Sequence, residues 1–385
     1  MADRDRGEPC LPHPLWDELV AAAGEAELLG RSVDASLHGR GPDVPLCGRG
    51  VRTSELPNQQ GPLPERAWTV PDGLELRREK ESPSSITKLV ECPLSWFLEY
   101  TLQIRPGRLA ALPEGNKLFG TFCHRLVETL VAERSEWEPE VARRRAEQLF
   151  GPFLDEMAAA LKLPGCEADL ATFREQTLHA VDSLFGRIGE TGLSIVGCER
   201  EMERVDDAGQ PHAGRIDLLL QDHNGNPVPW DLKWTNNSKY RREEMQGNQS
   251  LQLAAYCWLL GSPPGSAHAA YFMLKQAELI ATEAPWAKRE EAVPTDLGAV
   301  WTEALANSRR QLEALRRGEA QAPGVTEDGA EEPDPAPRCG FCNYGIICGV
   351  RHGSRGFTAQ PIPRGLPTSE AFHPASAALF AQVSG

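Results

Sequence analysis

The 385-residue sequence lacks the features that define several common protein classes. It contains no apolar run close to the roughly 18 residues that a membrane-spanning helix needs. Residues 1–6 lack the basic and then apolar order of a secretory signal peptide. The chain also has no internal repeat and no G-x-x-x-x-G-K-[ST] loop, which holds nucleotide phosphates in motor proteins. We therefore expect a cytoplasmic protein that makes no membrane contact and carries no motor of its own.

An excess of positive charge is also missing. The 40 Lys and Arg residues are outnumbered by 55 Asp and Glu residues, and the formal net charge is −15. Because phosphate binding depends on clustered basic side chains, this balance argues against a protein that coats nucleic acid without specificity. The local field matters more than the net charge, and Lys239, Arg241 and Arg242 form one basic cluster that we expect to contact a nucleic acid.

Ten cysteines are present, and in a reducing compartment they indicate thiols or metal ligands rather than disulfides. Cys339, Cys342 and Cys348 form a C-x2-C-x5-C pattern, which is typical of a zinc ion or an iron–sulfur cluster. Two alternatives for the fourth ligand are open, His352 for a tetrahedral Zn2+ or the distant Cys92 for a 4Fe-4S cluster. The other six have no ligand spacing and are expected to pack: Cys10, Cys47, Cys123, Cys166, Cys198 and Cys257.

Composition divides the chain into three parts. Residues 1–80 are rich in Gly, Pro and Arg, which predicts a partly disordered N-terminal arm with one helical stretch at 15–29. Residues 81–350 form one domain, in which an acidic Pro/Gly linker at 319–337 delivers the cysteine triplet. Residues 351–385 are expected to be a C-terminal tail.

The domain alternates helical and strand patterns. Helices are expected at 84–100, 117–134, 140–161, 168–189, 248–260 and 297–317. Short apolar runs at 194–203, 214–221 and 228–234 predict three strands, with a further strand at 267–275. Asp-Ala-Gly and Asn-Gly-Asn separate the first three runs and indicate hairpin turns. The order predicts an α/β fold.

Two of these strands carry acidic residues in apolar surroundings. In a strand side chains alternate, so Asp231 and Lys233 lie side by side on the face opposite Trp230 and Leu232. Asp217 stands in an apolar run, where an uncompensated charge is costly to bury. A shared cation compensates it, and carboxylate ligands suit Mg2+ or Mn2+.

In their order and spacing, these motifs resemble the PD-(D/E)XK nuclease superfamily, in particular the RecB-like nuclease domains of the AddB type that carry a 4Fe-4S cluster. The resemblance covers roughly residues 82–350. It rests on Ser82-Pro83-Ser84-Ser85-Ile86, Cys92-Pro93-Leu94-Ser95-Trp96, Gly120-Thr121-Phe122-Cys123-His124, Gly214-Arg215-Ile216-Asp217, Trp230-Asp231-Leu232-Lys233, Gln252-Leu253-Ala254-Ala255-Tyr256 and the cysteine triplet. It implies a mixed central sheet flanked by helices, with a cysteine-ligated iron–sulfur cluster as a staple.

The resemblance also assigns catalytic roles. It implies that Asp217 and Asp231 hold the divalent metal and that Lys233 orients or activates the attacking water, with Asp231 in place of the commoner Glu. It adds His124 as a helical metal ligand, for which a surface histidine is the alternative. Glu199 matches a further acidic ligand, although Glu201 at i+2 competes for the same role.

Three further assignments follow from the resemblance. Gln252 and Tyr256 are implied to line the site and touch the DNA strand, although a helical pair at the edge of the core is the alternative. Cys92 matches the first cysteine of the cluster, which favours 4Fe-4S over zinc.

The expected function is a Mg2+- or Mn2+-dependent deoxyribonuclease, an exonuclease that hydrolyses phosphodiester bonds at single-stranded DNA ends in recombination, repair or defence. Related domains are often fused to a helicase-like region, so we expect a separately encoded helicase partner. Two alternatives stay open: a catalytically weak DNA-binding scaffold of a helicase–nuclease complex, and a nuclease of CRISPR adaptation.

Overall fold

The computed structural model describes residues 43–46, 49–52, 65–76, 78–105, 115–263, 265–325 and 339–350. The chain forms two compact units, Met1–Gly61 and Pro62–Gly385. In the first, β1 (Asp43–Leu46) and β2 (Arg49–Arg52) pair as an antiparallel hairpin. The expected helix at 15–29, the C-terminal tail and most of the linker lie outside the described residues.

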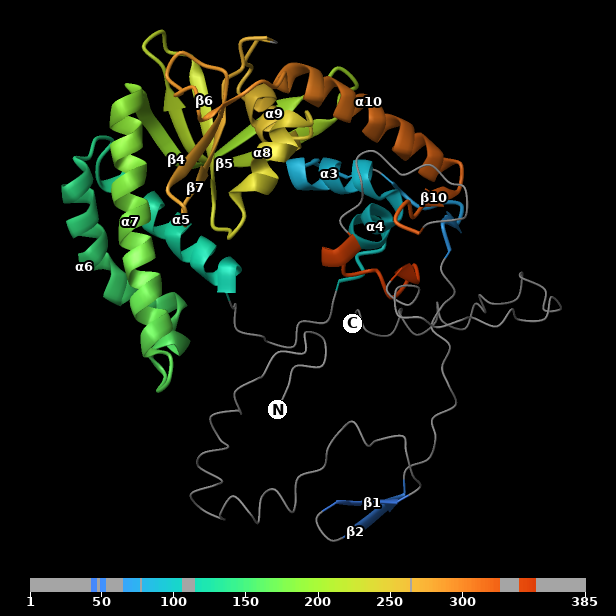
Figure 1. The fold of residues 1–385 in the computed structure, drawn as a ribbon. Coiled ribbons are helices and arrows are strands. Elements are labelled where there is room, and N and C mark those ends of the chain that lie inside the picture. The colour runs from blue at the N-terminus through green and yellow to red at the C-terminus, as the bar shows by residue number, and fades with distance from the viewer. Residues whose placement is uncertain are drawn as a thin grey trace, which may run out of the picture. The chain divides into compact units, whose positions relative to one another are not determined.

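The second unit is built on a mixed six-stranded sheet in the order β4-β5-β6-β7-β8-β9 (Figure 1). The strands are β4 (Ser194–Val205), β5 (Pro211–Gln221), β6 (Pro227–Lys233), β7 (Ala270–Met273), β8 (Glu278–Thr282) and β9 (Ala292–Val293). The first three form an antiparallel meander, and β6 then pairs with β7 in parallel. The predicted mixed sheet is present.

Local turn chemistry produces the meander. In the β5–β6 turn, Asp222 Oδ1 accepts hydrogen bonds from the backbone N–H groups of Asn224 and Asn226, both at 2.8 Å. Gly225 has φ of +81°, in the left-handed region that glycine adopts without steric cost. The short loop therefore returns the chain directly beside β5 and places the start of β6.

Helices cover both faces of this sheet. On one face α5 (Gly115–Glu133), α6 (Pro139–Met157) and α7 (Glu167–Thr191) pack in a core that contains Trp230 and Phe272. On the other, α9 (Leu251–Leu259) and α10 (Leu297–Arg316) pack in a core that contains Tyr271 and Met273. Because neighbouring residues of β7 enter opposite cores, this central strand is buried on both sides. The polar helix α8 (Ser238–Gln246) precedes α9.

A third core joins distant parts of the chain. It contains α3 (Pro83–Glu91), α4 (Pro93–Trp96), η2 (Phe97–Thr101) and the end of α10, together with Tyr344 near η4 (Cys339–Phe341). Beside it, β3 (Ala67–Thr69) pairs with β10 (Glu319–Gln321). The compact unit thus includes residues that the sequence assigned to the arm, and it begins at Pro62 rather than at residue 81.

The expected helix at 84–100 is interrupted at Cys92. This residue ends α3 with an extended conformation (φ −158°, ψ 95°), and α4 begins at Pro93. Proline disfavours helical geometry in the residue before it and cannot donate a backbone hydrogen bond, so the break falls at this point. The side chain of Cys92 therefore lies at a corner between two helices.

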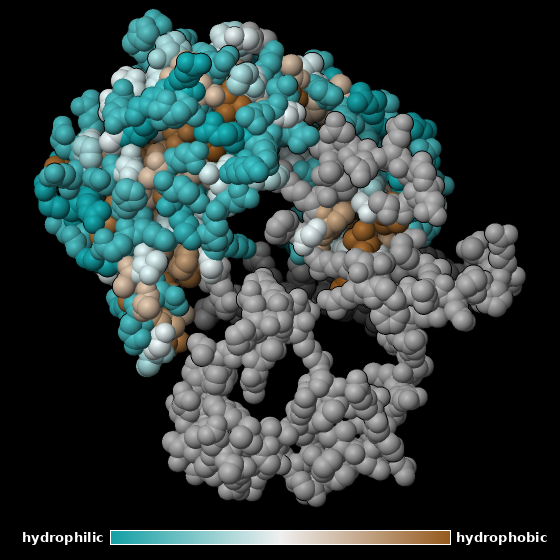
Figure 2. Space-filling model, viewed as in Figure 1, coloured by the Kyte–Doolittle hydropathy of each residue, from teal (hydrophilic) through white to brown (hydrophobic). Residues whose placement is uncertain are grey.

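Two surface properties complete the description. No helix among the described residues is long and apolar enough to cross a membrane. Hydrophilic residues dominate the described surface in the view of Figure 2.

Candidate active site

The site begins where β5 and β6 lie side by side. The register pairs Leu218 with Trp230, which brings the neighbouring residues Asp217 and Asp231 close together. The backbone N–H of Leu232 donates to Asp217 Oδ2 at 2.8 Å and fixes that carboxylate. Two acidic side chains from adjacent strands are thus held in a largely buried position.

Asp231 is fully buried, with 0% exposure. Lys233 Nζ lies 2.5 Å from Asp231 Oδ2 as an ion pair, as the alternation of β6 predicts. Within the described part of the chain, however, neither carboxylate oxygen of Asp231 accepts a well-formed hydrogen bond. The Lys233 ammonium compensates part of this buried charge, and a divalent cation held beside Asp217 and Asp231 would compensate more of it.

His124 approaches the same point from α5. Its Nε2 atom lies 2.9 Å from the carbonyl oxygen of Leu232 and donates to it, because a carbonyl only accepts. The Nδ1 atom then lies 3.3 Å from Glu199 Oε1 and 3.8 Å from Asp217 Oδ1. The ligand atoms of His124, Glu199 and Asp217 all lie within 4.8 Å of one another. A backbone acceptor that fixes the free nitrogen of a histidine is typical of metal sites.

The backbone of β4 decides between the two candidate glutamates. Glu199 has φ of +49°, in the left-handed region that few residues other than glycine adopt. The register with β5 pairs Cys198 and Arg200 but passes over Glu199. Glu199 therefore turns toward His124, whereas the side chain of Glu201 is 81% exposed. The structure brings Glu199 to the site and leaves Glu201 outside.

Burial and neighbouring charges shift the pKa values of Asp217, Glu199 and His124. Burial and the neighbouring charge of Asp231 raise the pKa of Asp217 to about 7. The hydrogen bond with His124 lowers the pKa of Glu199. Burial lowers the pKa of His124, but Glu199 and Asp217 outweigh it and hold that pKa above its usual value. In the metal-free protein a protonated His124 therefore neutralises part of the acidic charge.

Gln252 and Tyr256 share one face of α9, as their spacing predicts. Gln252 Nε2 donates to Tyr256 Oη at 2.9 Å. Burial and the charges of Asp231 and Asp217 raise the pKa of Tyr256. The phenol therefore keeps its proton and, with its oxygen already accepting from Gln252, has that proton free to donate.

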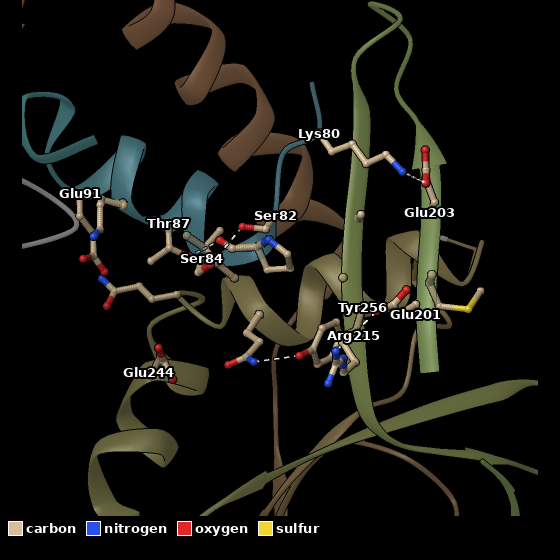
Figure 3. A pocket seen from close by; sticks show the side chains of 18 of the residues that line it. Lys80, Ser82, Ser84, Thr87, Glu91, Glu201, Glu203, Arg215, Glu244 and Tyr256 are labelled. Carbon is tan, nitrogen blue, oxygen red and sulfur yellow. Dashed lines mark hydrogen bonds and ion pairs between the residues drawn. The ribbon is translucent and has the colours of Figure 1, made fainter. Parts of the chain in front are cut away.

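A cleft of about 920 Å³ adjoins the site (Figure 3). Residues from α3, β4, β5, α8 and α9 line it, among them Ser84, Thr87, Lys88, Glu203, Arg215, Arg241, Gln252 and Tyr256. Asp217 and Asp231 lie outside its lining. Tyr256 connects the cleft to these two carboxylates, and Arg215, 3.4 Å from Glu199 Oε2, connects it to the third acidic residue.

The expected basic cluster is divided. Lys239 is exposed and lies 3.4 Å from Glu243 on the same helix. Arg242 Nη2 lies 3.1 Å from Glu278 on β8. Arg241 alone of the three lines the cleft, where it pairs with a buried glutamate of α8. Each of the three basic side chains is thus paired with a carboxylate, and their contact with nucleic acid stays a prediction.

The four expected cluster ligands line one pocket of about 220 Å³: Cys92, Cys339, Cys342 and Cys348. Burial, and to a lesser degree the three other thiols, raise the pKa of Cys92 to about 12. His352, the alternative zinc ligand, lies outside the described residues. The pocket therefore brings together cysteines from two segments that lie far apart in the sequence. A cluster or other metal centre that uses Cys92 requires this arrangement.

One residue of the cleft had no role in the sequence interpretation. Arg215 stands two residues before Asp217 and connects Glu199 to the cleft. Its place within the Gly-Arg-Ile-Asp motif was the available signal. Only the structure shows that its side chain lies between the acidic cluster and the open cleft.

Comparison with known proteins adds a family match. The model of the PD-(D/E)XK nuclease superfamily matches residues 80–349, which is more than half of the chain. A search of curated proteins found no match. A solved structure titled "Crystal structure of SSO0001" aligns at 16% sequence identity over 59% of this chain and 94% of that chain, with a TM-score of 0.24. A TM-score this low carries no structural argument.

Proposed function

The chain belongs to the PD-(D/E)XK nuclease superfamily, and from this premise we propose that it is a Mg2+- or Mn2+-dependent deoxyribonuclease of the RecB-like, AddB type. The observation that carries the proposal is the group formed by His124, Glu199 and Asp217, with ligand atoms within 4.8 Å of one another. Asp231, buried beside Asp217 and ion-paired with Lys233, is the proposed fourth ligand. Oxygen ligands with one imidazole suit a hard divalent ion.

Each side chain of the site has a separate role in the proposed reaction. A bound divalent ion supplies Lewis-acid polarisation of the scissile phosphate and lowers the pKa of the attacking water. Lys233 Nζ, held beside Asp231, orients that water and stabilises the negative charge that develops on the phosphate oxygens. The Tyr256 hydroxyl donates a hydrogen bond to the DNA strand and thereby fixes the strand's position. His124 and the carboxylates hold the ion and take no part in bond breaking.

Single-stranded DNA is the proposed substrate. A cleft of about 920 Å³ falls in the range of about 300–1,000 Å³ that encloses ligands of drug size. Such a space can hold a few nucleotides of a single strand, which supports this proposal. We propose that a separately encoded helicase supplies the strand, because the chain has no motor loop.

We further propose that Cys92, Cys339, Cys342 and Cys348 bind a 4Fe-4S cluster. All four thiols line one pocket of the second unit, which supports a shared metal centre, and thiolates are the usual ligands of iron–sulfur clusters.

The test is an assay of anaerobically purified protein on end-labelled single- and double-stranded DNA, with Mg2+, Mn2+ or EDTA. We expect metal-dependent cleavage of the single strand from its ends. Metal-dependent binding without cleavage would instead establish the alternative of a scaffold subunit. The scaffold alternative has weaker support, because a protein without catalytic activity has no need to keep Lys233 beside Asp231. A third possibility, a nuclease of CRISPR adaptation, uses the same site and is distinguished by trimming of short duplex ends to a fixed length.

A further inference from the structure

Four basic side chains line the cleft, and their ion pairs with carboxylates differ in length. Lys80 Nζ lies 2.6 Å from Glu203, Arg241 Nη1 lies 2.5 Å from its buried glutamate partner, and Lys88 is tightly paired with Glu99. Arg215 differs from these three, because its contacts are long: 3.4 Å from Glu199 Oε2 and 3.5 Å from Glu201 Oε1. Charge-assisted hydrogen bonds of arginine are usually about 2.7–2.9 Å.

The position of Arg215 makes this weak pairing informative. Its side chain is 60% exposed, and ion pairs at such positions contribute little to stability. A different guanidinium nitrogen approaches each carboxylate, so neither Glu199 nor Glu201 uses the planar fork that binds two oxygens of one group. The fork is thus available to an oxyanion that enters the cleft.

Arg215 also lies close to the proposed chemistry. It precedes Asp217 by two residues on β5, a distance of roughly 7 Å along the strand. Glu199 lies between Arg215 and the other metal ligands, because its Oε1 atom faces His124 and its Oε2 atom faces Arg215. A phosphate held by Arg215 would therefore be a near neighbour of the phosphate at the metal ligands. Figure 3 shows Arg215 within the cleft, on the same side as Glu201 and Tyr256.

We propose that Arg215 is a substrate-binding residue whose guanidinium exchanges Glu199 and Glu201 for a DNA backbone phosphate adjacent to the scissile one. The inference rests on the proposed nuclease function. Binding of the strand then removes a cation from Glu199 Oε2 and leaves that carboxylate free to serve the metal. Substrate binding and completion of the acidic site are coupled through this single side chain.

The test compares Arg215→Ala with wild type on a short single-stranded oligonucleotide. We expect KM to rise about tenfold or more, with kcat nearly unchanged. Anisotropy of a labelled oligonucleotide in Ca2+ should show weaker binding and a salt dependence of log affinity reduced by about 0.7, the value for one lost phosphate contact. Mn2+ affinity without DNA should stay at the wild-type level or increase. Arg215→Lys should restore the salt dependence but only part of the affinity.

A second measurement identifies the phosphate. Oligonucleotides that each carry one neutral methylphosphonate should reveal a position next to the cleavage site at which wild-type binding weakens. Arg215→Ala should be insensitive to the substitution at that position and retain sensitivity elsewhere. The matched control is Arg144→Ala on α6, because Arg144 is similarly exposed (64%), has a weak 3.7 Å ion pair and lies outside the cleft lining. It should behave like wild type.

Two failures are distinguishable. A wild-type protein that neither binds nor cleaves oligonucleotides overturns the nuclease proposal and this inference with it. A wild-type protein that cleaves, with Arg215→Ala unchanged in KM, salt dependence and methylphosphonate profile, overturns the role of Arg215 alone.

Discussion

At the scale of single residues, the site brings three carboxylates together with one histidine and one lysine. Asp217, Asp231 and Glu199 meet near His124 and Lys233, and Asp231 is fully buried. The alternation of β6 allowed Asp231 and Lys233 to be predicted, and the apolar run around Asp217 marked that residue. The choice of Glu199 over Glu201 was not predictable, because a positive φ breaks the alternation on which such reasoning depends.

The raised pKa of Asp217, about 7, predicts how metal binding depends on pH. Metal binding needs this carboxylate ionised and His124 neutral, so affinity should fall as the pH decreases through 7. In the metal-free folded protein Asp217 stays protonated up to about pH 7, whereas in the unfolded chain it ionises at about pH 4. The free energy of unfolding therefore falls by on the order of 4 kcal/mol as the pH rises from about 4 to 7. We expect the rise in Tm caused by Mn2+ to be larger at pH 8 than at pH 6, measured by calorimetry. An equal rise at both values would contradict this assignment.

The two glutamates of β4 form a matched pair for a second test. Glu199→Gln should weaken Mn2+ binding tenfold or more, because it removes a ligand charge next to His124. Glu201→Gln makes the same chemical change at an exposed position and should leave Mn2+ affinity unchanged. Titration calorimetry measures both. Equal loss in the two variants would show that the effect is general electrostatics and not ligation.

At the scale of elements, local signals predicted more than tertiary ones. The β4–β5–β6 meander followed from turn residues, and most of the long helices followed from apolar periodicity. Helix α8 was missed because its surface is polar and few of its residues are buried. Strands β8 and β9 are short, and β10 lies in a stretch whose composition indicated a linker. Their strand conformation depends on pairing with partners elsewhere in the chain.

The corner at Cys92 predicts the effect of losing the proposed cluster. Cys92 ends α3, which also lines the cleft of about 920 Å³, so Cys92→Ala should bleach a brown protein and lower its Tm by several degrees. Absorbance near about 400 nm and iron analysis measure the cluster. Cys166→Ala, outside the cysteine pocket, is the control. A colourless protein with one zinc, unaffected by Cys92→Ala and emptied by His352→Ala, would refute the cluster.

At the scale of the whole molecule, several hydrophobic cores support one site. The sheet with its two helical layers positions the acidic residues, and the third core ties α3 and α10 to the segment around Tyr344. The fold class was predictable because the motifs occur in the superfamily's order. The boundary at Pro62 was not, because β3 belongs to the compact unit only through its pairing with β10.

The helicase proposal is tested by reconstitution. Because the chain has no motor loop and carries a net charge of −15, the isolated protein should cut short single strands slowly and leave blunt duplex intact. Duplex digestion should appear only with the helicase and ATP, and removal of residues 1–61, the part of the predicted arm outside the second unit, should weaken it. Processive digestion of blunt duplex by the isolated chain without ATP would show that no motor is required.

The most direct test of the central claim compares Asp217→Ala with Lys233→Ala, measuring Mn2+ binding and single-turnover cleavage of an end-labelled single strand in the same preparations. Asp217 is a proposed ligand and Lys233 is not, so Asp217→Ala should lose both metal binding and cleavage. Lys233→Ala should keep most of the metal affinity and lose cleavage by at least about a hundredfold. Cleavage at the wild-type rate by either variant would contradict the account and place the active site elsewhere.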